Sequence, residues 1–124
     1  MRMTWNEAKY DSILKQILVE CPPSIGVDLD GTLVESSSYK SWDYVGPIIK
    51  RVVDRVLEKE KEGYVIKIFT ARAYDERCIP VIKKHLRDNG LPEWEVTNVK
   101  DPSMVEIWDD RAIRVERNTG VFKD

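Results

Sequence analysis

Two aspartates separated by a single residue, Asp28 and Asp30, come directly after a short apolar run of the sequence. Two carboxylates this close together repel each other unless a positive charge lies between them. Mg²⁺ is the natural cation to supply that charge, because it takes oxygen ligands and often combines one or two carboxylates with a substrate phosphate. Gly31 and Thr32 follow, and they predict a tight turn whose backbone amides can approach a phosphate. The four residues therefore predict a site for magnesium and phosphate.

Further side chains that could bind an anion or a cation follow two other apolar runs. They are Thr70 and Arg72 after residues 65–69, and Asp109, Asp110 and Arg111 after residues 105–108. Asp109 could complete the coordination shell of a cation, and Lys100 lies in the loop before the second run. The arginines at positions 72 and 111 could clamp a second phosphate or a nucleotide, or could instead hold Asp109 or Asp110 through a salt bridge.

Each of these residue types also has an ordinary structural use. Residues 28–32 could form an Asx turn with helix capping, and Thr70 could cap a following helix. Lys100 could be a solvated loop lysine, and the paired aspartates at 109–110 could cap a turn. The site therefore depends on whether the fold brings the separate groups together.

The hydrophobic pattern predicts the elements that would position these residues. Short apolar runs predict strands at 25–28, at 65–69, near Val96 and at 105–108. Helical periodicity predicts one helix from Gly46 and Pro47 to Gly63, and another within residues 75–88, stopped by Asn89 and Gly90. A helical turn is expected after Asp101 and Pro102, and a last apolar alternation surrounds Ile113 and Val115.

Strands and helices thus alternate without hairpin signals, which predicts an α/β fold with a central parallel sheet. We expect a single three-layer, Rossmann-like domain over residues 1–124, with helices on both faces of the sheet and no large cap domain. In such sheets ligands bind at the carboxyl ends of the strands. The aspartates, the threonine and the arginines named above follow strand ends, so we expect them at one edge.

An additional amphipathic helix is predicted over the first 20 residues. Its apolar stripe consists of Tyr10, Ile13, Leu14, Ile17 and Leu18, which recur at steps of three and four residues. Thr4 and Glu7 form a plausible capping box, and Pro22 and Pro23 end the helix.

The composition limits the classes of protein that the chain can be. With 20 Lys and Arg against 22 Asp and Glu, a net charge of −2 argues against binding nucleic acid mainly through a strong basic field. Cys21 and Cys78 show no spacing typical of a zinc site or a disulfide scaffold. Apolar runs are too short for a signal peptide or a membrane span. We therefore expect a reduced, cytoplasmic protein without membrane association.

Four segments, taken in order, resemble the motifs of the haloacid dehalogenase superfamily of phosphotransferases. They are IGVDLDGTLVE at 25–35, VIKIFTARA at 65–73, Lys100, and EIWDDRAI at 106–113. The sequence is similar to the small, capless members common in phages and bacteria, in which a TAR element and a DDRA element frame the lysine. The resemblance implies that residues 25–116 form the catalytic core of a metal-binding, HAD-like hydrolase.

The resemblance also implies a role for each catalytic residue. Asp28 would be the nucleophile that forms an aspartyl-phosphate, and Asp30 would protonate the leaving oxygen and later deprotonate water. Thr70 would donate a hydrogen bond to a phosphoryl oxygen, and Lys100 would neutralise charge on the nucleophile and the transferred group. An Asp at position 30 favours ester hydrolysis over dehalogenation, because that chemistry needs a proton shuttle.

For the metal, the resemblance implies a shell made by Asp28, the backbone carbonyl of Asp30, and Asp109. Asp110 would act through a water molecule or would orient Lys100, and the sequence does not separate these two roles. Gly31, Thr32, Arg72, Asp110 and Arg111 would contact the substrate or support the residues that bind it.

The implied function is that of a magnesium-dependent phosphomonoesterase with an open site. An open site admits bulky substrates, such as a nucleotide or a polynucleotide 3′-phosphate, unless a partner subunit in a homo-oligomer covers it. Asp109, Asp110, Arg111 and the later Gly120 are also similar to the phosphatase half of polynucleotide kinase-phosphatases, although no kinase P-loop pattern is present. The alternative is a non-catalytic binding or regulatory module.

Three aromatic residues follow the first motif, in the segment expected to form a flap: Tyr39, Trp42 and Tyr44. Their rings could stack on a base, or they could pack the flap onto the rest of the domain.

Overall fold

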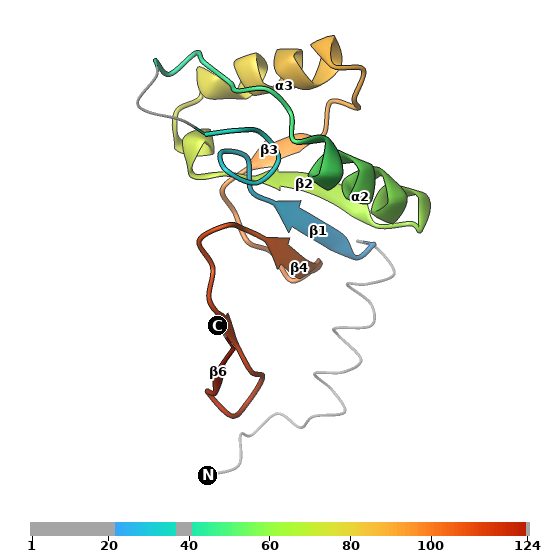
Figure 1. Cartoon of the computed structure of the whole chain (residues 1–124), viewed down its shortest axis with the longest axis vertical. Helices are drawn as coiled ribbons and strands as arrows, with labels where there is room; N and C mark the ends of the chain where they lie inside the picture. The colour runs from blue at the N-terminus through green and yellow to red at the C-terminus, as the bar shows by residue number, and fades with distance from the viewer. Residues whose placement is uncertain (1–21, 37–40, 124) are drawn as a thin grey trace.

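The computed structural model describes residues 22–36 and 41–123 (Figure 1). Its main sheet has the strand order β3-β2-β1-β4, and all of its pairings are parallel. The strands are β1 (Ser24–Val27), β2 (Val65–Phe69), β3 (Glu95–Thr97) and β4 (Met104–Trp108). The predicted α/β class, parallel sheet and four strand positions are confirmed. The helix predicted over residues 1–20 lies outside the described residues.

Two helices connect neighbouring strands. Helix α2 (Lys50–Lys61) links β1 to β2, and α3 (Cys78–Asp88) links β2 to β3 after the short 3₁₀ helix η1 (Ala71–Tyr74). Helix α2 begins later than Gly46 and Pro47 predict, because Ile48 still forms a β-bridge with Val34. The predicted stop signals are confirmed, since Gly63 and Gly90 adopt φ values of +103° and +73° after the two helices.

Both helices pack on the same face of the sheet. Ile66 and Ile68 of β2 belong to one buried core together with Val56 of α2 and Leu86 of α3. Right-handed crossovers that proceed in one direction across a parallel sheet place their helices on one face. The connection from β3 to β4 is a short loop at 98–103 and carries no helix to the other face. Within the described residues the sheet therefore has one helical layer, and the third layer that we predicted is not confirmed.

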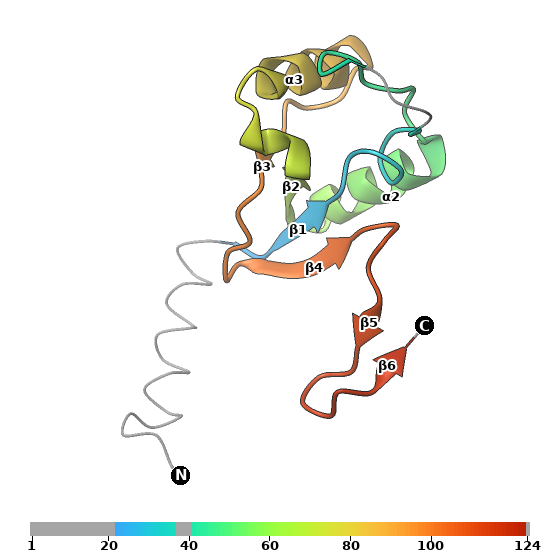
Figure 2. The same ribbon diagram turned by 90° about the vertical axis from the view of Figure 1, so that its left-hand side faces the viewer.

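The turn expected after Asp101 and Pro102 is a single turn, closed by a hydrogen bond from Met104 N to Asp101 O (3.1 Å), and it leads directly into β4. A hairpin also follows the sheet, because β5 (Arg114–Val115) and β6 (Phe122–Lys123) pair in antiparallel fashion. Figure 2 shows this hairpin extending away from the sheet beyond β4.

No helix in the described part of the chain is long and apolar enough to cross a membrane.

Candidate functional site

The loop after β1 is fixed by buried leucines. Leu29 and Leu33 are fully buried, and the amides of Leu33 and Val34 both donate to the carbonyl of Leu29 at 3.0 Å. Because Leu29 points into the core, its two neighbours Asp28 and Asp30 are only partly buried and line an open cavity. The alternation of acidic and apolar residues thus anchors the loop while leaving both carboxylates available to a ligand.

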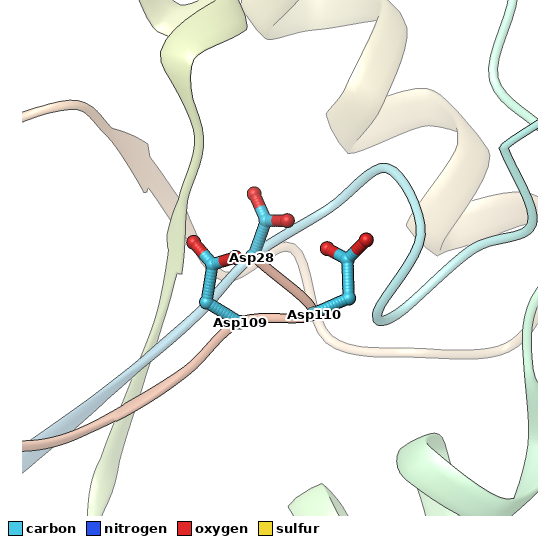
Figure 3. Close-up of side chains that lie close together, drawn as sticks. All are labelled: Asp28, Asp109 and Asp110. Carbon is cyan, nitrogen blue, oxygen red and sulfur yellow. The ribbon is translucent and has the colours of Figure 1, made fainter. Parts of the chain in front are cut away.

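Three carboxylates gather at the carboxyl ends of β1 and β4. These strands are neighbours in the sheet, and the amide of Asp28 donates to Trp108 O at 2.8 Å, directly before Asp109. One oxygen each of Asp28, Asp109 and Asp110 lies within 4.8 Å of the other two. Figure 3 shows the three carboxyl groups on the same side of the two chain segments. We call these residues the aspartate cluster, and their oxygens suit a hard cation such as Mg²⁺.

The electrostatics of the aspartate cluster favour a bound cation. Burial, together with the negative charge of Asp109, raises the pKa of Asp28 to about 6. A carboxyl group whose neighbours are also acidic gains protons more readily than it would alone. A divalent cation between the carboxylates would reverse this effect, so the donor set fits a metal such as Mg²⁺.

Gly31 and Thr32 connect the loop after β1 to the loop after β4. Gly31 has a φ of +88°, and a Cβ built on it would lie 2.6 Å from Asp110 Oδ2, so a side chain has no room there. The hydroxyl of Thr32 accepts a hydrogen bond from Asp110 N and donates to Asp110 Oδ1, both at 3.1 Å. Asp28 Oδ2 is a longer alternative acceptor at 3.5 Å. The structure thus gives both residues a role in placing Asp110.

Asp30 is not part of the aspartate cluster. Its carboxylate pairs with Arg72, whose Nη1 lies 3.1 Å from Asp30 Oδ1. The other guanidinium nitrogen of Arg72, Nη2, donates to the carbonyls of Trp42 and Tyr44 at 2.7 and 2.8 Å. The sequence allowed Arg72 either to clamp a phosphate or nucleotide or to pair with Asp109 or Asp110, and the structure pairs it with Asp30 instead. Arg72 therefore ties the first motif to the segment at 41–45.

Thr70 lies at the end of β2, where it is buried but still lines the cavity. Its hydroxyl oxygen accepts a hydrogen bond from Arg72 N at 3.1 Å and so caps η1. The capping role that the sequence allowed is confirmed. Because the oxygen acts as the acceptor in this bond, its hydrogen can still donate to an oxygen of a ligand.

The cavity between these loops has a volume of about 730 Å³ and is open to solvent. Of the residues predicted for the site, the cavity is lined by Asp28, Asp30, Thr70, Arg72, Asp109, Asp110 and Arg111. Five further residues line it that were not among the predicted site residues, namely Ser36, Phe69, Ala71, Tyr74 and Asn98. Asn98 could have been found, because it directly follows β3 as the aspartates follow β1 and β4.

Two predicted features lie apart from the cavity. Lys100 is exposed in the loop before β4 and is not among the lining residues. Trp42 packs against the guanidinium of Arg77, 4.4 Å from the ring centre, so its ring is held on the body rather than in the cavity. Tyr39 lies outside the described residues. The aromatic residues that line the cavity are instead Phe69 and Tyr74, and Tyr74 is 82% exposed.

Chemically, this edge of the sheet offers three carboxylates that could hold a cation, a hydroxyl donor, a further carboxylate held by an arginine, and an open cavity. This combination suits the binding of a cation and an anion side by side. Comparison with protein-family models, curated proteins and solved structures finds no match to this chain.

Proposed function

We propose that this protein is a magnesium-dependent phosphatase of the haloacid dehalogenase type that hydrolyses phosphate monoesters through an aspartyl-phosphate on Asp28. The observation that carries the proposal is the aspartate cluster. Residues 28, 109 and 110 come from opposite ends of the sequence, yet their oxygens lie within 4.8 Å of one another at the edge of a cavity. Carboxylates that only cap turns have no need to converge in this way.

In the proposed reaction a carboxylate oxygen of Asp28 attacks phosphorus, and the bond from phosphorus to the ester oxygen breaks. Asp30 gives a proton to the departing oxygen, and later takes one from the water that hydrolyses the aspartyl-phosphate. Thr70 donates its hydroxyl hydrogen to a phosphoryl oxygen. Atoms and charges balance, because the alcohol leaves protonated and Asp28 is regenerated with release of phosphate.

Asp28, Asp109 and the backbone carbonyl of Asp30 would hold Mg²⁺, with Asp110 contributing through water. Bound there, the ion would neutralise charge on the phosphoryl group. Thr32 keeps Asp110 in place through its two hydrogen bonds. Arg72 would hold Asp30 in the orientation needed for proton transfer, and the role of Lys100 would require its loop to turn toward the cavity.

The proposed function also implies a domain architecture and a cellular location. We propose a single three-layer, Rossmann-like domain without a large cap, acting in the cytoplasm without contact to a membrane. The open cavity of about 730 Å³ supports a small phosphorylated substrate or a nucleic-acid end, including a nucleotide or a polynucleotide 3′-phosphate. A homo-oligomer in which a partner covers the cavity is compatible with this substrate class.

One observation favours a second candidate, a non-catalytic binding or regulatory module of the same fold. The exposed side chain of Lys100 does not line the cavity, so the positive group that the resemblance implies stands apart from the aspartate cluster. A module that binds a cation and an anion without turnover would not need that lysine.

Phosphate release by the full chain separates the two candidates. An aryl phosphate, a nucleotide panel and 3′-phosphorylated oligonucleotides would be tested with Mg²⁺ and with a chelator. We expect Mg²⁺-dependent release that Asp28→Asn abolishes. Asp54→Asn is the matched control, because Asp54 pairs with Lys50 on an exposed helix surface. If no substrate is hydrolysed and beryllium fluoride does not bind in the presence of Mg²⁺, the phosphatase proposal is wrong.

A further inference from the structure

The face of the main sheet opposite α2 and α3 is apolar and carries no helix among the described residues. Alternation along β2 and β4 directs Val65 and Ile107 to this side, where they are 41% and 37% exposed. Val105, which is 53% exposed, is the extra residue of β4 at the register shift between Met104 and Glu106. In the parallel register Gly26 of β1 lies between Lys67 of β2 and Ile107 of β4, so these side chains belong to one surface. We call this surface the open face.

Parallel sheets are usually covered on both faces, because their strands carry apolar side chains in both directions. A contiguous apolar surface left in water is also unusual for a monomeric protein and marks a place where something docks. We therefore expect another protein segment to cover the open face.

The polar groups of the open face already have partners within the chain. Lys67 lies 2.6 Å from Asp101 and 3.5 Å from Glu95, so its charge is neutralised on the protein. Ser24 and Ser103 share a buried hydrogen bond of 2.9 Å. An apolar side chain that covers this surface would leave no group unsatisfied, which is the condition that burial requires.

The centre of the open face is shaped by a missing side chain. A Cβ on Gly26 would lie 2.6 Å from Met104 Sδ and 3.1 Å from Phe69 Cβ, so these two side chains already close over the glycine. The methionine can adjust to an incoming surface, because its side chain is unbranched and flexible.

We propose that residues 1–20 of this chain pack as an amphipathic helix on the open face, with the stripe of Tyr10, Ile13, Leu14, Ile17 and Leu18 against β1, β2 and β4. The sequence predicts such a helix, and its apolar stripe needs a surface to cover. A helix over residues 4–20 would be about 25 Å long. Strand β1 has four residues and β2 and β4 have five, so these strands are about 13 to 17 Å long and the helix is long enough to cover them from end to end.

The connection to the sheet favours this segment over any other occupant. Pro22 and Pro23 alone separate Cys21 from Ser24, the first residue of β1, which pairs directly with Val65 and Met104. A tether this short holds the stripe beside the open face at an effective concentration in the millimolar range. A second copy of the chain would have to compete with that concentration from solution.

Matched substitutions in the full chain test the proposal by thermal unfolding. Ile17→Asp and Gln16→Asp place the same charge on adjacent residues, but only the first falls on the stripe. We expect Ile17→Asp to lower the Tm by roughly 5 to 10 °C and Gln16→Asp by less than about 2 °C. Equal effects of the two substitutions would overturn the proposal.

A milder pair of variants covers the case in which the charged variant fails to fold. Ile17→Ala and Ile107→Ala should lower the Tm by less together than the sum of their separate effects, because each removes the other's partner. Ile17→Ala with Val121→Ala, a residue of the hairpin loop, should be additive. Additivity in both pairs would contradict the proposed contact.

Light scattering identifies the competing occupant. We expect a wild-type mass independent of protein concentration. A dimer that Ile107→Asp dissociates, while Ile17→Asp leaves it intact, would assign the open face to a second copy and overturn the proposal. Phosphatase activity is not a readout in these experiments, so their outcome does not depend on the proposed function.

Discussion

The two loops that form the aspartate cluster are held in place by different means. The loop after β1, in the middle of the sheet, is anchored by the fully buried side chains of Leu29 and Leu33. The loop after β4 follows an edge strand, and Asp109 and Asp110 are both exposed. What positions Asp110 is its pair of hydrogen bonds to Thr32. The hydrophobic core therefore holds the loop after β1 in place, and the loop after β1 in turn holds the loop after β4 through Thr32.

This difference predicts that changes in the first loop affect chemistry and metal binding at once, whereas the second loop can be displaced without loss of the core. The largest effect is expected for Asp28→Asn. The amide keeps the shape of the side chain but cannot act as the nucleophile, so turnover should fall at least about a thousandfold. Circular dichroism should report an unchanged fold. Substantial residual activity, with deamidation excluded by mass spectrometry, would place the chemistry elsewhere.

The link between the loops is tested by Thr32→Val. Valine is close in shape but loses both hydrogen bonds to Asp110, so the loop after β4 loses its support. We expect the affinity for Mg²⁺, measured by calorimetry, to fall about 10- to 100-fold, as for other residues that orient metal ligands. Thr119→Val is the control, because Thr119 makes a comparable bond to Glu116 in the hairpin. Unchanged affinity in Thr32→Val would mean that Asp110 does not depend on the first loop.

A smaller effect is expected for Arg72→Lys. Lysine keeps the charge but cannot bind Asp30 and the carbonyls of Trp42 and Tyr44 at the same time. We expect kcat to fall roughly tenfold while KM changes little, since Asp30 would move away from the leaving oxygen. Arg87→Lys, which affects an exposed pair with Glu93 away from the segment at 41–45, is the matched control. An unchanged kcat would remove Arg72 from the positioning of Asp30.

The smallest expected effect is a dependence of the thermal stability of the metal-free protein on pH. The pKa of Asp28 is raised to about 6, so its contribution to stability is fully present below the unfolded pKa near 4 and is lost as the pH rises through 6. Asp101, with a pKa lowered to about 2, contributes constantly above pH 4 and does not oppose this trend. With a chelator present, we expect the Tm to fall by a few degrees between pH 4.5 and 7, to a first approximation.

Two controls sharpen the pH experiment. Asp28→Asn should remove this part of the pH dependence, since the amide does not titrate. Mg²⁺ should remove it as well, because binding to the ionised carboxylates stabilises the native state. A Tm that rises over the same range in the chelated wild type, and that Asp28→Asn leaves unchanged, would contradict the assigned cause.

Local patterns predicted the elements best where their signals were self-contained. Strand β2 matches its predicted range, because its apolar run lies between Gly63 and the polar residues from Thr70 onward. The hairpin was missed, since its strands are only two residues long and depend on the positive φ of Asn118 and Gly120. A turn of that kind stabilises strands through backbone conformation, which hydrophobic periodicity does not report.

The site was predictable as a set of strand ends but not as a network of contacts. The rule that ligands bind at the carboxyl ends of parallel strands located Asp28, Asp109 and Thr70 correctly at one cavity. The partner of Arg72 was not predictable, because it depends on how the segment at 41–45 folds back over the first motif. The exposed position of Lys100 likewise depends on the path of a loop that has no periodic pattern.

The position of β4 at the edge of the sheet has a consequence for biosynthesis. Asp28 leaves the ribosome before Asp109 and Asp110, which follow only after β1, β2 and β3 have been made. A nascent chain can therefore bury Leu29 and pack both helices before it has any means of closing the aspartate cluster. Metal binding at the proposed site would therefore begin only once β4 has docked on β1, so the site could not form before that strand has been made.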